Sequence, residues 1–295
     1  MARASKRTIS RDALSNHDHF EQISPEVGEL DEAAFDEALR EDADEALSLL
    51  AEMTSATDPT LRELARRLAG RLSVDLSRRA GSSRRGVGRL KTRRMRDEIA
   101  DIDIDASLDA IIGRESGFGL DTDEVRVRDW AKPTSAICLV VDRSGSMGGK
   151  PLATAALFAA SVAMRQPDDY SVVMFSSDAV TVKSQDVVAS TEHVVGSVLS
   201  LRGHGTTDLK GALRAANEQL TRSNATRKVT ILLSDCRSSS PNGIIEMAAA
   251  LDELFVVAPA DDHDEARRFA EEVGARFAII DGPSDVPRVF AHLID

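Results

Sequence analysis

The sequence predicts an α/β protein in which a doubly wound, mostly parallel open sheet follows a mainly helical N-terminal region. Beyond residue 134, continuous apolar runs alternate with helix-length segments that carry an apolar stripe, a pattern typical of βαβ units. Runs such as ICLVV are apolar at every position, as expected for parallel strands that helices cover on both faces. In the first 80 residues, apolar residues instead recur at spacings of three and four, which indicates amphipathic helices.

Each expected strand of the C-terminal part is a short apolar run, and each expected helix follows such a run. The expected strands span 136–141, 171–175, 180–182, 229–233, 254–257 and 277–280. The expected helices span 152–165, 209–220, 244–251, 264–273 and 286–293. Ligands of open parallel sheets bind at the carboxyl ends of the strands, so we expect the functional site at that edge.

Residues 1–133 are expected to form a helical N-terminal region, and residues 134–295 a second domain. One helix should begin after Asp58, a favourable N-cap, with Pro59 at the first helical position. The N-terminal region is at first acidic and then rich in arginine. The sequence GSSRRGVG at 81–88 lies within a stretch near 80–98 that we expect to be flexible, because its glycines and serines leave no face to bury.

The overall composition is that of an acidic globular protein. The 295 residues are 42% apolar and 29% charged, close to globular averages, and the net charge is −12. Nucleic-acid affinity depends on clustered lysine and arginine, so nucleic acid is not an expected partner. No stretch reaches the roughly 20 apolar residues of a membrane span, and the N-terminus lacks an apolar signal segment. We therefore expect a cytoplasmic protein without a membrane partner.

Neither the cysteines nor the histidines predict a metal site. Cys138 and Cys236 lie in or beside expected strands, where free and mostly buried thiols of a reducing compartment fit better than a disulfide. The run His17-Asp18-His19 contains residues that bind metals, but no third ligand follows nearby. We expect this run to belong to a polar N-terminal tail.

The first expected strand of the C-terminal domain ends in a polar, glycine-rich loop that leads into a helix. Asp142, Ser144 and Ser146 occur at every second position of this loop. At that spacing, their side-chain oxygens can converge on one point. Carboxylate and hydroxyl oxygens are the hard ligands that Mg²⁺ prefers, so the loop predicts a magnesium site.

Two further segments bring similar oxygen ligands to the same edge of the sheet. Thr206 and Thr207 precede the expected helix 209–220, and Asp235 follows the expected strand 229–233. The loops at the carboxyl ends of neighbouring parallel strands meet, so we expect one of the two threonines and Asp235 to complete the site. Mn²⁺ is the second candidate metal.

These residues resemble the metal-ion-dependent adhesion site of the von Willebrand factor A-type (vWA) family. The positions that match the family's ligands are Asp142, Ser144, Ser146, Thr207 and Asp235. The resemblance implies that the hydroxyls coordinate the metal directly and that the aspartates help directly or through water. It also implies that a carboxylate from a partner protein fills the last coordination position.

The sequence departs from the family pattern at two places. The family often has Gly-Gly-Thr where this chain has Gly205, Thr206 and Thr207, and Asp-Gly where it has Asp235 and Cys236. Thr207 is the expected ligand because the following Asp-Leu fits the family's usual continuation, and Thr206 remains the alternative. We expect the change at Cys236 to leave metal affinity unaffected.

Two catalytic motifs that also use a glycine-rich loop do not fit this one. A P-loop requires glycine at the position of Ser144 and serine or threonine after Lys150, where this chain has Pro151. A nucleophile elbow requires glycine two residues before the serine, whereas Ser144 stands before Ser146. We therefore expect a binding protein and not an enzyme.

The chain as a whole is similar to bacterial vWA proteins of the CoxE-like group, which are associated with MoxR-type AAA+ ATPases. That resemblance covers residues 134–295 most closely. It implies an adaptor whose metal engages an aspartate or glutamate of the ATPase or of its client, in protein remodelling or metalloenzyme maturation. The alternative is the vWA-bearing subunit of a magnesium or cobalt chelatase-like complex, although 1–133 is short for the AAA+-like domain of such a subunit.

Overall fold

Two compact units make up the part of the chain that the structure describes. The computed structural model describes residues 8–80, 89–94, 101–102, 104–105, 126–131, 135–143, 149–200, 206–238 and 242–294. One unit consists of the described residues within 1–82 and 135–295, and the other of those within 83–134. The N-terminal helices and the C-terminal sheet therefore belong to the same unit.

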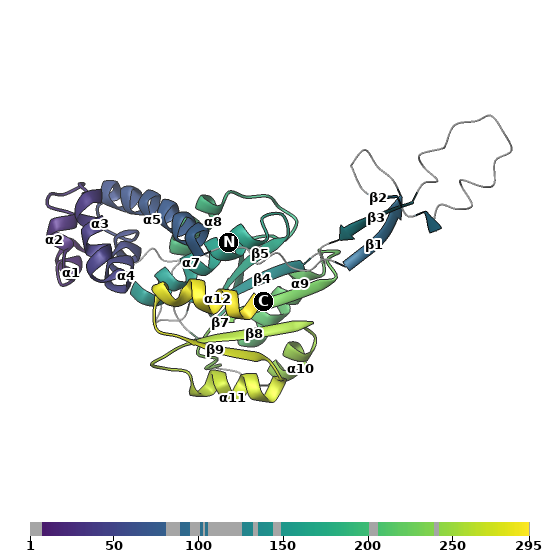
Figure 1. Ribbon diagram of the computed structural model, residues 1–295. Helices are drawn as coiled ribbons and strands as arrows, with labels where there is room; N and C mark the ends of the chain where they lie inside the picture. Colours follow the sequence, from purple (N-terminus) through teal and green to yellow (C-terminus); the bar gives the residue numbers. More distant parts are fainter. Residues whose placement is uncertain are drawn as a thin grey trace. The chain divides into compact units, whose positions relative to one another are not determined.

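The larger unit is built on an open sheet of six strands in the order β6-β5-β4-β7-β8-β9 (Figure 1). The strands are β4 (Ser135–Asp142), β5 (Tyr170–Phe175), β6 (Ala179–Lys183), β7 (Arg227–Leu233), β8 (Glu253–Pro259) and β9 (Arg276–Ile280). All neighbouring strands are parallel except β5 and β6. From β4 the chain winds first to one side of the sheet and then to the other, which confirms the predicted doubly wound, mostly parallel open sheet.

Helices connect these strands and cover both faces of the sheet. They are α7 (Gly149–Arg165), α8 (Thr191–Ser200), α9 (Leu209–Leu220), α10 (Ile244–Ala249), α11 (Asp264–Val273) and α12 (Val286–Ile294), with a short 3₁₀ turn, η2 (Pro283–Asp285), before α12. Sequence analysis did not anticipate α8, because its buried valines are β-branched and have low helix propensity. Among the helices of the described ranges, none combines the length and the apolar surface that a bilayer span requires.

Alternate residues of each strand face opposite helical layers. Ile137, Leu139 and Val141 of β4 contribute to the hydrophobic core that includes α7, α8 and α12. Cys138 and Val140 contribute to the core that includes α9, α10 and α11. Both cysteines of the chain are free and buried, as predicted, and burial raises the pKa of the Cys138 thiol to about 12. This thiol is therefore a packing group that stays protonated.

The N-terminal region forms helices, and two of them pack on the helices that cover one face of the sheet. The N-terminal helices are α1 (Arg11–Leu14), α2 (Phe20–Ile23), α3 (Glu32–Glu41), α4 (Ala43–Met53) and α5 (Pro59–Ala80). As predicted, α5 begins at Pro59, and the carboxylate of Asp58 accepts the N–H of Thr60 at 2.9 Å. Helix α4 lies against α7, and α5 lies against both α7 and α8 (Figure 1). We refer to α4 and α5 as the outer layer.

The interface between the outer layer and the helices beneath it is closely packed. The hydroxyls of Ser77 on α5 and Ser161 on α7 are 3.2 Å apart and buried. At the end of α4, the buried hydroxyl of Thr54 lies 3.4 Å from the carbonyl of Leu199 on α8. A cavity of only about 20 Å³ remains between the helices, lined in part by Leu50. The outer layer therefore contributes to the core.

The expectation of a polar N-terminal tail at His17 is wrong. Leu14, Phe20 and Ile23 are almost completely buried in the core that extends into α4. The imidazole of His17 lies between Glu45 of α4, at 2.8 Å, and Glu52 of α4, at 3.0 Å. The apolar side chains of this segment anchor it to the core. In the sequence, the polar residues between them hide the apolar pattern.

The smaller unit contains a three-stranded antiparallel sheet in the order β1-β3-β2. Its strands are β1 (Arg89–Arg94), β2 (Asp101–Ile102) and β3 (Arg126–Ala131). Residue 89 pairs with residue 131, and residue 101 pairs with residue 128. The stretch 80–98, in which we expect flexibility, thus contains β1, while 81–88 and 95–98 lie outside the described residues.

Candidate metal centre

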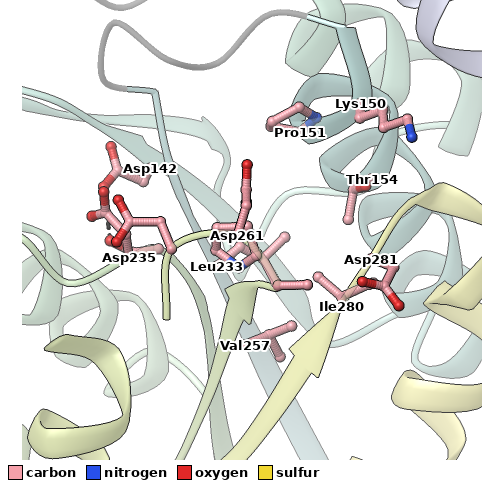
Figure 2. Close-up of a pocket in the computed structure, with 14 residues that line it drawn as sticks. Asp142, Lys150, Pro151, Thr154, Leu233, Asp235, Val257, Asp261, Ile280 and Asp281 are labelled. Carbon is pink, nitrogen blue, oxygen red and sulfur yellow. Dashed lines mark hydrogen bonds between the residues drawn. The ribbon is translucent and has the colours of Figure 1, made fainter. Parts of the chain in front are cut away.

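Two of the predicted metal ligands lie at the carboxyl ends of adjacent central strands. Asp142 is the last residue of β4, and Asp235 follows closely after the end of β7. Both carboxylates line one cavity of about 460 Å³, and Figure 2 shows them side by side at one end of it. Ser144 and Ser146 lie outside the described residues, so their part in the predicted site stays a prediction.

Ser234 connects the ends of these two strands through its hydroxyl. It donates a hydrogen bond to the Oδ2 atom of Asp142, at 2.7 Å, and accepts the N–H of Cys236, at 2.9 Å. Asp142 is only 3% exposed, so this bond helps to fix the carboxylate where a rotation would otherwise be possible.

The turn after β7 presents Asp235 at the cavity. The Oδ1 atom of Asp235 accepts the N–H of Arg237, at 3.0 Å, which stabilises the turn. Cys236 has φ +60°, in the left-handed region that glycine adopts without strain. The turn thus keeps a backbone conformation suited to the glycine that the vWA pattern has here, although the residue is a cysteine.

The third predicted ligand segment precedes α9. The carboxylate of Asp208 caps α9 by accepting the N–H of Gly211 at 2.9 Å, and the N–H of Asp208 donates to the carbonyl of Ser176 at 2.7 Å. The hydroxyl of Ser238 also lies 3.3 Å from the carbonyl of Thr207. Thr207 is 8% exposed, whereas the neighbouring Thr206 is exposed. These bonds tie the threonine segment to the turns after β5 and β7.

The negative potentials of the two aspartates overlap at the end of β7. Burial raises the pKa of the Cys236 thiol, and the charges of Asp235 and Asp142 raise it further. Both carboxylates therefore act on the same point. Because Asp142 and Asp235 line the same end of the cavity, a cation bound there would gain from both charges.

The cavity extends from the two aspartates over the carboxyl ends of β8 and β9. Its apolar wall includes Leu233, Val257 and Ile280, and its rim carries further carboxylates (Figure 2). These are Asp261, Asp262 and Asp281, and Lys150 of α7 also lines the cavity. Asp262 pairs with Arg237 at 2.7 Å. The cavity has room for a side chain of a binding partner beside the aspartates.

The residues present fit a hard divalent cation better than a soft one. The described residues that line the cavity offer carboxylate and hydroxyl oxygens, and they include no histidine or cysteine. Within the described ranges, no group of three or more histidine, cysteine, aspartate or glutamate residues is arranged so that it could hold a metal ion by itself. Two carboxylates supplemented by hydroxyls suit Mg²⁺, which binds through few carboxylates.

Sequence analysis missed the residues that hold the ligands in place. These residues are Ser234 and Asp208, to which sequence analysis gave no role in orienting the ligands. A serine at the end of a strand carries little information, because its hydrogen-bond partner on β4 is remote in the sequence. The run Asp208-Leu209-Lys210-Gly211 does contain a usable signal, since Asp is a favoured N-cap.

The fold is an α/β domain with an open, mostly parallel sheet, and the carboxylates of two candidate ligands line a cavity at the carboxyl ends of its central strands. Within this class, residues 136–282 match the von Willebrand factor type A domain. The chain therefore carries a vWA domain, as the sequence motifs predicted. No curated protein sequence matches the chain significantly.

Several solved structures are similar to part of this chain at low sequence identity. Proximal thread matrix protein 1 from the mussel byssus is 15% identical, with a TM-score of 0.48, over 55% of this chain and 47% of that one. A structure of the same mussel protein with a zinc-occupied metal-ion-dependent adhesion site (MIDAS) motif gives the same identity, coverage and TM-score. A von Willebrand factor type A protein from Catenulispora acidiphila is 20% identical, with a TM-score of 0.45, over 57% of this chain and 43% of that one. The matched part is thus less than half of each of these structures.

Proposed function

We propose that this chain is a metal-dependent adaptor that uses a Mg²⁺ ion to capture a carboxylate of a partner protein. The observation that carries the proposal is the convergence of Asp142 and Asp235 at one end of the same cavity. Asp142 is buried and oriented by Ser234, as a metal ligand must be to keep its geometry. Mn²⁺ is the second candidate metal.

The remaining ligands of the proposed site come from the sequence motif. Ser144 and Ser146 follow Asp142 at the spacing of the vWA adhesion site, and Thr207 lies in the segment that Asp208 and Ser238 tie to the same edge. The burial of Thr207 and the exposure of Thr206 support Thr207 as the ligand. The proposed ligand set is thus Asp142, Ser144, Ser146, Thr207 and Asp235.

Such a ligand set favours recognition of a carboxylate. Neutral hydroxyls make up three of the five proposed ligands, so much of the 2+ charge stays uncompensated. A bound Mg²⁺ would supply an electrophilic position for one oxygen of a partner's aspartate or glutamate. The cavity beside Asp142 would accommodate the partner residues that flank this carboxylate.

The same residues support binding rather than catalysis. The described lining of the cavity contains no histidine or cysteine that could act as a base or a nucleophile beside a serine. For the partner, we propose a MoxR-type AAA+ ATPase or its client, on the basis of the similarity of the whole chain to CoxE-like vWA proteins. In this role, the bound metal would hold a carboxylate of the ATPase or of its client on the adaptor.

A calorimetric titration with Mg²⁺ tests the metal site. We expect the wild type to bind Mg²⁺ and Asp235→Asn, which keeps the shape of the side chain, to bind about 10- to 100-fold more weakly. Asp142→Ala should abolish binding. The matched control is Asp261→Asn, which removes a carboxylate from the same cavity outside the ligand set. The proposed site is contradicted if Asp261→Asn loses as much Mg²⁺ affinity as Asp235→Asn. It is also contradicted if neither Asp235→Asn nor Asp142→Ala loses Mg²⁺ affinity.

A pull-down from native lysate tests the adaptor role. Wild type and Asp142→Ala are each used with Mg²⁺ and with EDTA, and the bound proteins are identified by mass spectrometry. We expect an AAA+ ATPase to be retained only by the wild type with Mg²⁺. Retention of tetrapyrrole-chelatase subunits would favour the chelatase alternative, and retention that ignores both metal and Asp142 would show that the metal site is not the recognition surface.

A further inference from the structure

The outer layer touches the chain at the point where the metal loop ends. Gly149 is the first residue of α7 and the first described residue after the loop that carries Ser144 and Ser146. Its φ is +51°, in the left-handed region. A methyl group added at Gly149 would lie 2.5 Å from the hydroxyl of Ser48 and 3.0 Å from Oε1 of Glu52, both on α4. A larger residue here would strain the backbone and would have to displace the ends of these two side chains.

A second contact joins α4 to the far side of the cavity. The carboxylate of Asp44, at the start of α4, accepts the N–H of Ser284 at 2.9 Å. A methyl group at Gly282 would collide with the same carboxylate. Gly282 follows directly after Asp281, which lines the cavity. One helix from outside the vWA match at 136–282 therefore contacts two segments that border the candidate metal centre.

Glu52 is held from its other side by His17. One carboxylate oxygen of Glu52 receives the imidazole at 3.0 Å, while the other faces Gly149. Side-chain exposure is 22% for His17 and 21% for Glu52, so the pair is largely shielded from water. The Glu52 carboxylate thus has a defined position on the surface of α4 that faces the start of α7.

We propose that Ser48 and Glu52 are positioning residues for the metal site, because they set where α7 begins and hence where the metal loop returns to the fold. This inference rests on the proposed metal-binding function. Binding of Mg²⁺ at Asp142 would then stabilise α4, and a substitution on α4 would by the same amount of free energy change the affinity for Mg²⁺.

Hydrogen exchange on the full chain tests this coupling in one direction. Exchange is followed in peptides from α4 and from the strands β4 and β7, with Mg²⁺ and with EDTA, for wild type and Asp142→Ala. We expect Mg²⁺ to slow exchange at β4 and β7 and also at α4 in the wild type, and to have no effect in Asp142→Ala. Protection at β4 and β7 without any change at α4 overturns the inference and leaves the metal site standing. No change anywhere overturns the metal site and the inference with it.

Titration of two α4 variants with Mg²⁺ tests the coupling in the other direction. Glu52→Gln and Glu45→Gln each remove one carboxylate that contacts His17, but only Glu52 also faces Gly149. We expect Glu52→Gln to weaken Mg²⁺ binding about fivefold or more and Glu45→Gln to leave it within about twofold, although the two changes remove the same charge. Equal Mg²⁺ affinities in the two variants overturn the inference, because a merely structural role of the pair with His17 would affect both alike.

Discussion

The two faces of the central sheet are covered in different ways. Helix α7 lies between the sheet and the outer layer, and every residue from 152 to 163 is buried. On the other face, α11 buries only Ala266 and Ala270 and exposes charged residues such as Glu271. One face of the sheet thus has a single helical layer, and the other has a second layer from outside the vWA match.

This difference shows that the N-terminal helices are part of the structure around the candidate metal centre. A helix that is apolar all round must be covered on every side, and α4 and α5 join α8 and α12 in covering α7. The metal loop leads from β4 into this covered helix. The less covered face carries the turn of Asp235 and the start of α9, so the proposed ligands come from both faces.

The largest effect that we expect concerns the outer layer itself. Leu50 of α4 is 1% exposed and lines the contact with α7. Leu50→Ala should lower the free energy of unfolding by about 2–5 kcal/mol, as in any well-packed core. Chemical denaturation followed by circular dichroism measures this change.

The control for Leu50→Ala lies on the other face of the sheet. Leu213 of α9 is fully buried there, and Leu213→Ala should lower the free energy of unfolding by a similar amount. Both variants should unfold in one transition, because the outer layer and the sheet form one compact unit. A separate early transition in Leu50→Ala alone would show that the outer layer folds independently.

Two glycines provide a sharper comparison of the faces. Gly149 and Gly274 both have positive φ, +51° and +67°, but a methyl group at Gly274 would meet nothing within 4 Å. Gly274→Ala at the end of α11 should therefore cost about 1–2 kcal/mol of stability, from backbone strain alone. Gly149→Ala should cost about 0.5–1.5 kcal/mol more, because the added methyl group forces the hydroxyl of Ser48 to move aside. Thermal or chemical unfolding measures both changes. Equal losses of stability in the two variants would mean that the side chains of α4 move aside at no cost.

The sheet could be predicted because its strands are continuous apolar runs that periodicity identifies. The placement of the outer layer could not be predicted in the same way. Its amphipathic helices show that they bury one face, but not what that face covers. The apolar surface of α7 on all sides was the sign that a second layer exists. The buried position of His17 was missed because Leu14 and Phe20 stand among polar residues.

The candidate metal centre was partly predictable for a topological reason. Asp142 and Asp235 follow strands that turn out to be neighbours, and the carboxyl ends of parallel neighbours meet at one edge. The hydroxyl of Ser234 and the contact of Ser48 with Gly149 could not be predicted. Each joins residues far apart in the sequence through a side chain that has no distinctive spacing.

A smaller effect is expected at the turn after β7, on the face that lacks a second layer. Cys236 occupies φ +60°, which costs a residue with a side chain about 1–2 kcal/mol. Cys236→Gly relieves this strain but makes the unfolded chain more flexible, so the net gain in stability should stay below about 1 kcal/mol. Cys236→Ala keeps the strain and should bring no gain in a thermal unfolding experiment. A loss of stability in the glycine variant would mean that the packing of the thiol outweighs the strain.

The smallest effect that we expect is the pH dependence that His17 gives the outer layer. Burial lowers the pKa of His17, but the hydrogen bonds and charges of Glu45 and Glu52 outweigh burial and raise it above the usual 6.5. A raised pKa means that the protonated form stabilises the folded state, fully below about pH 6.5, and that this contribution is lost as the pH rises through the folded-state pKa. His17→Gln should therefore lower stability by less than about 1 kcal/mol at pH 6 and by progressively less at higher pH. Melting temperatures across this pH range measure the effect, and His292→Gln, at an exposed histidine, is the control. A difference in melting temperature between His17→Gln and wild type that does not change with pH would show that packing, and not charge, holds the imidazole.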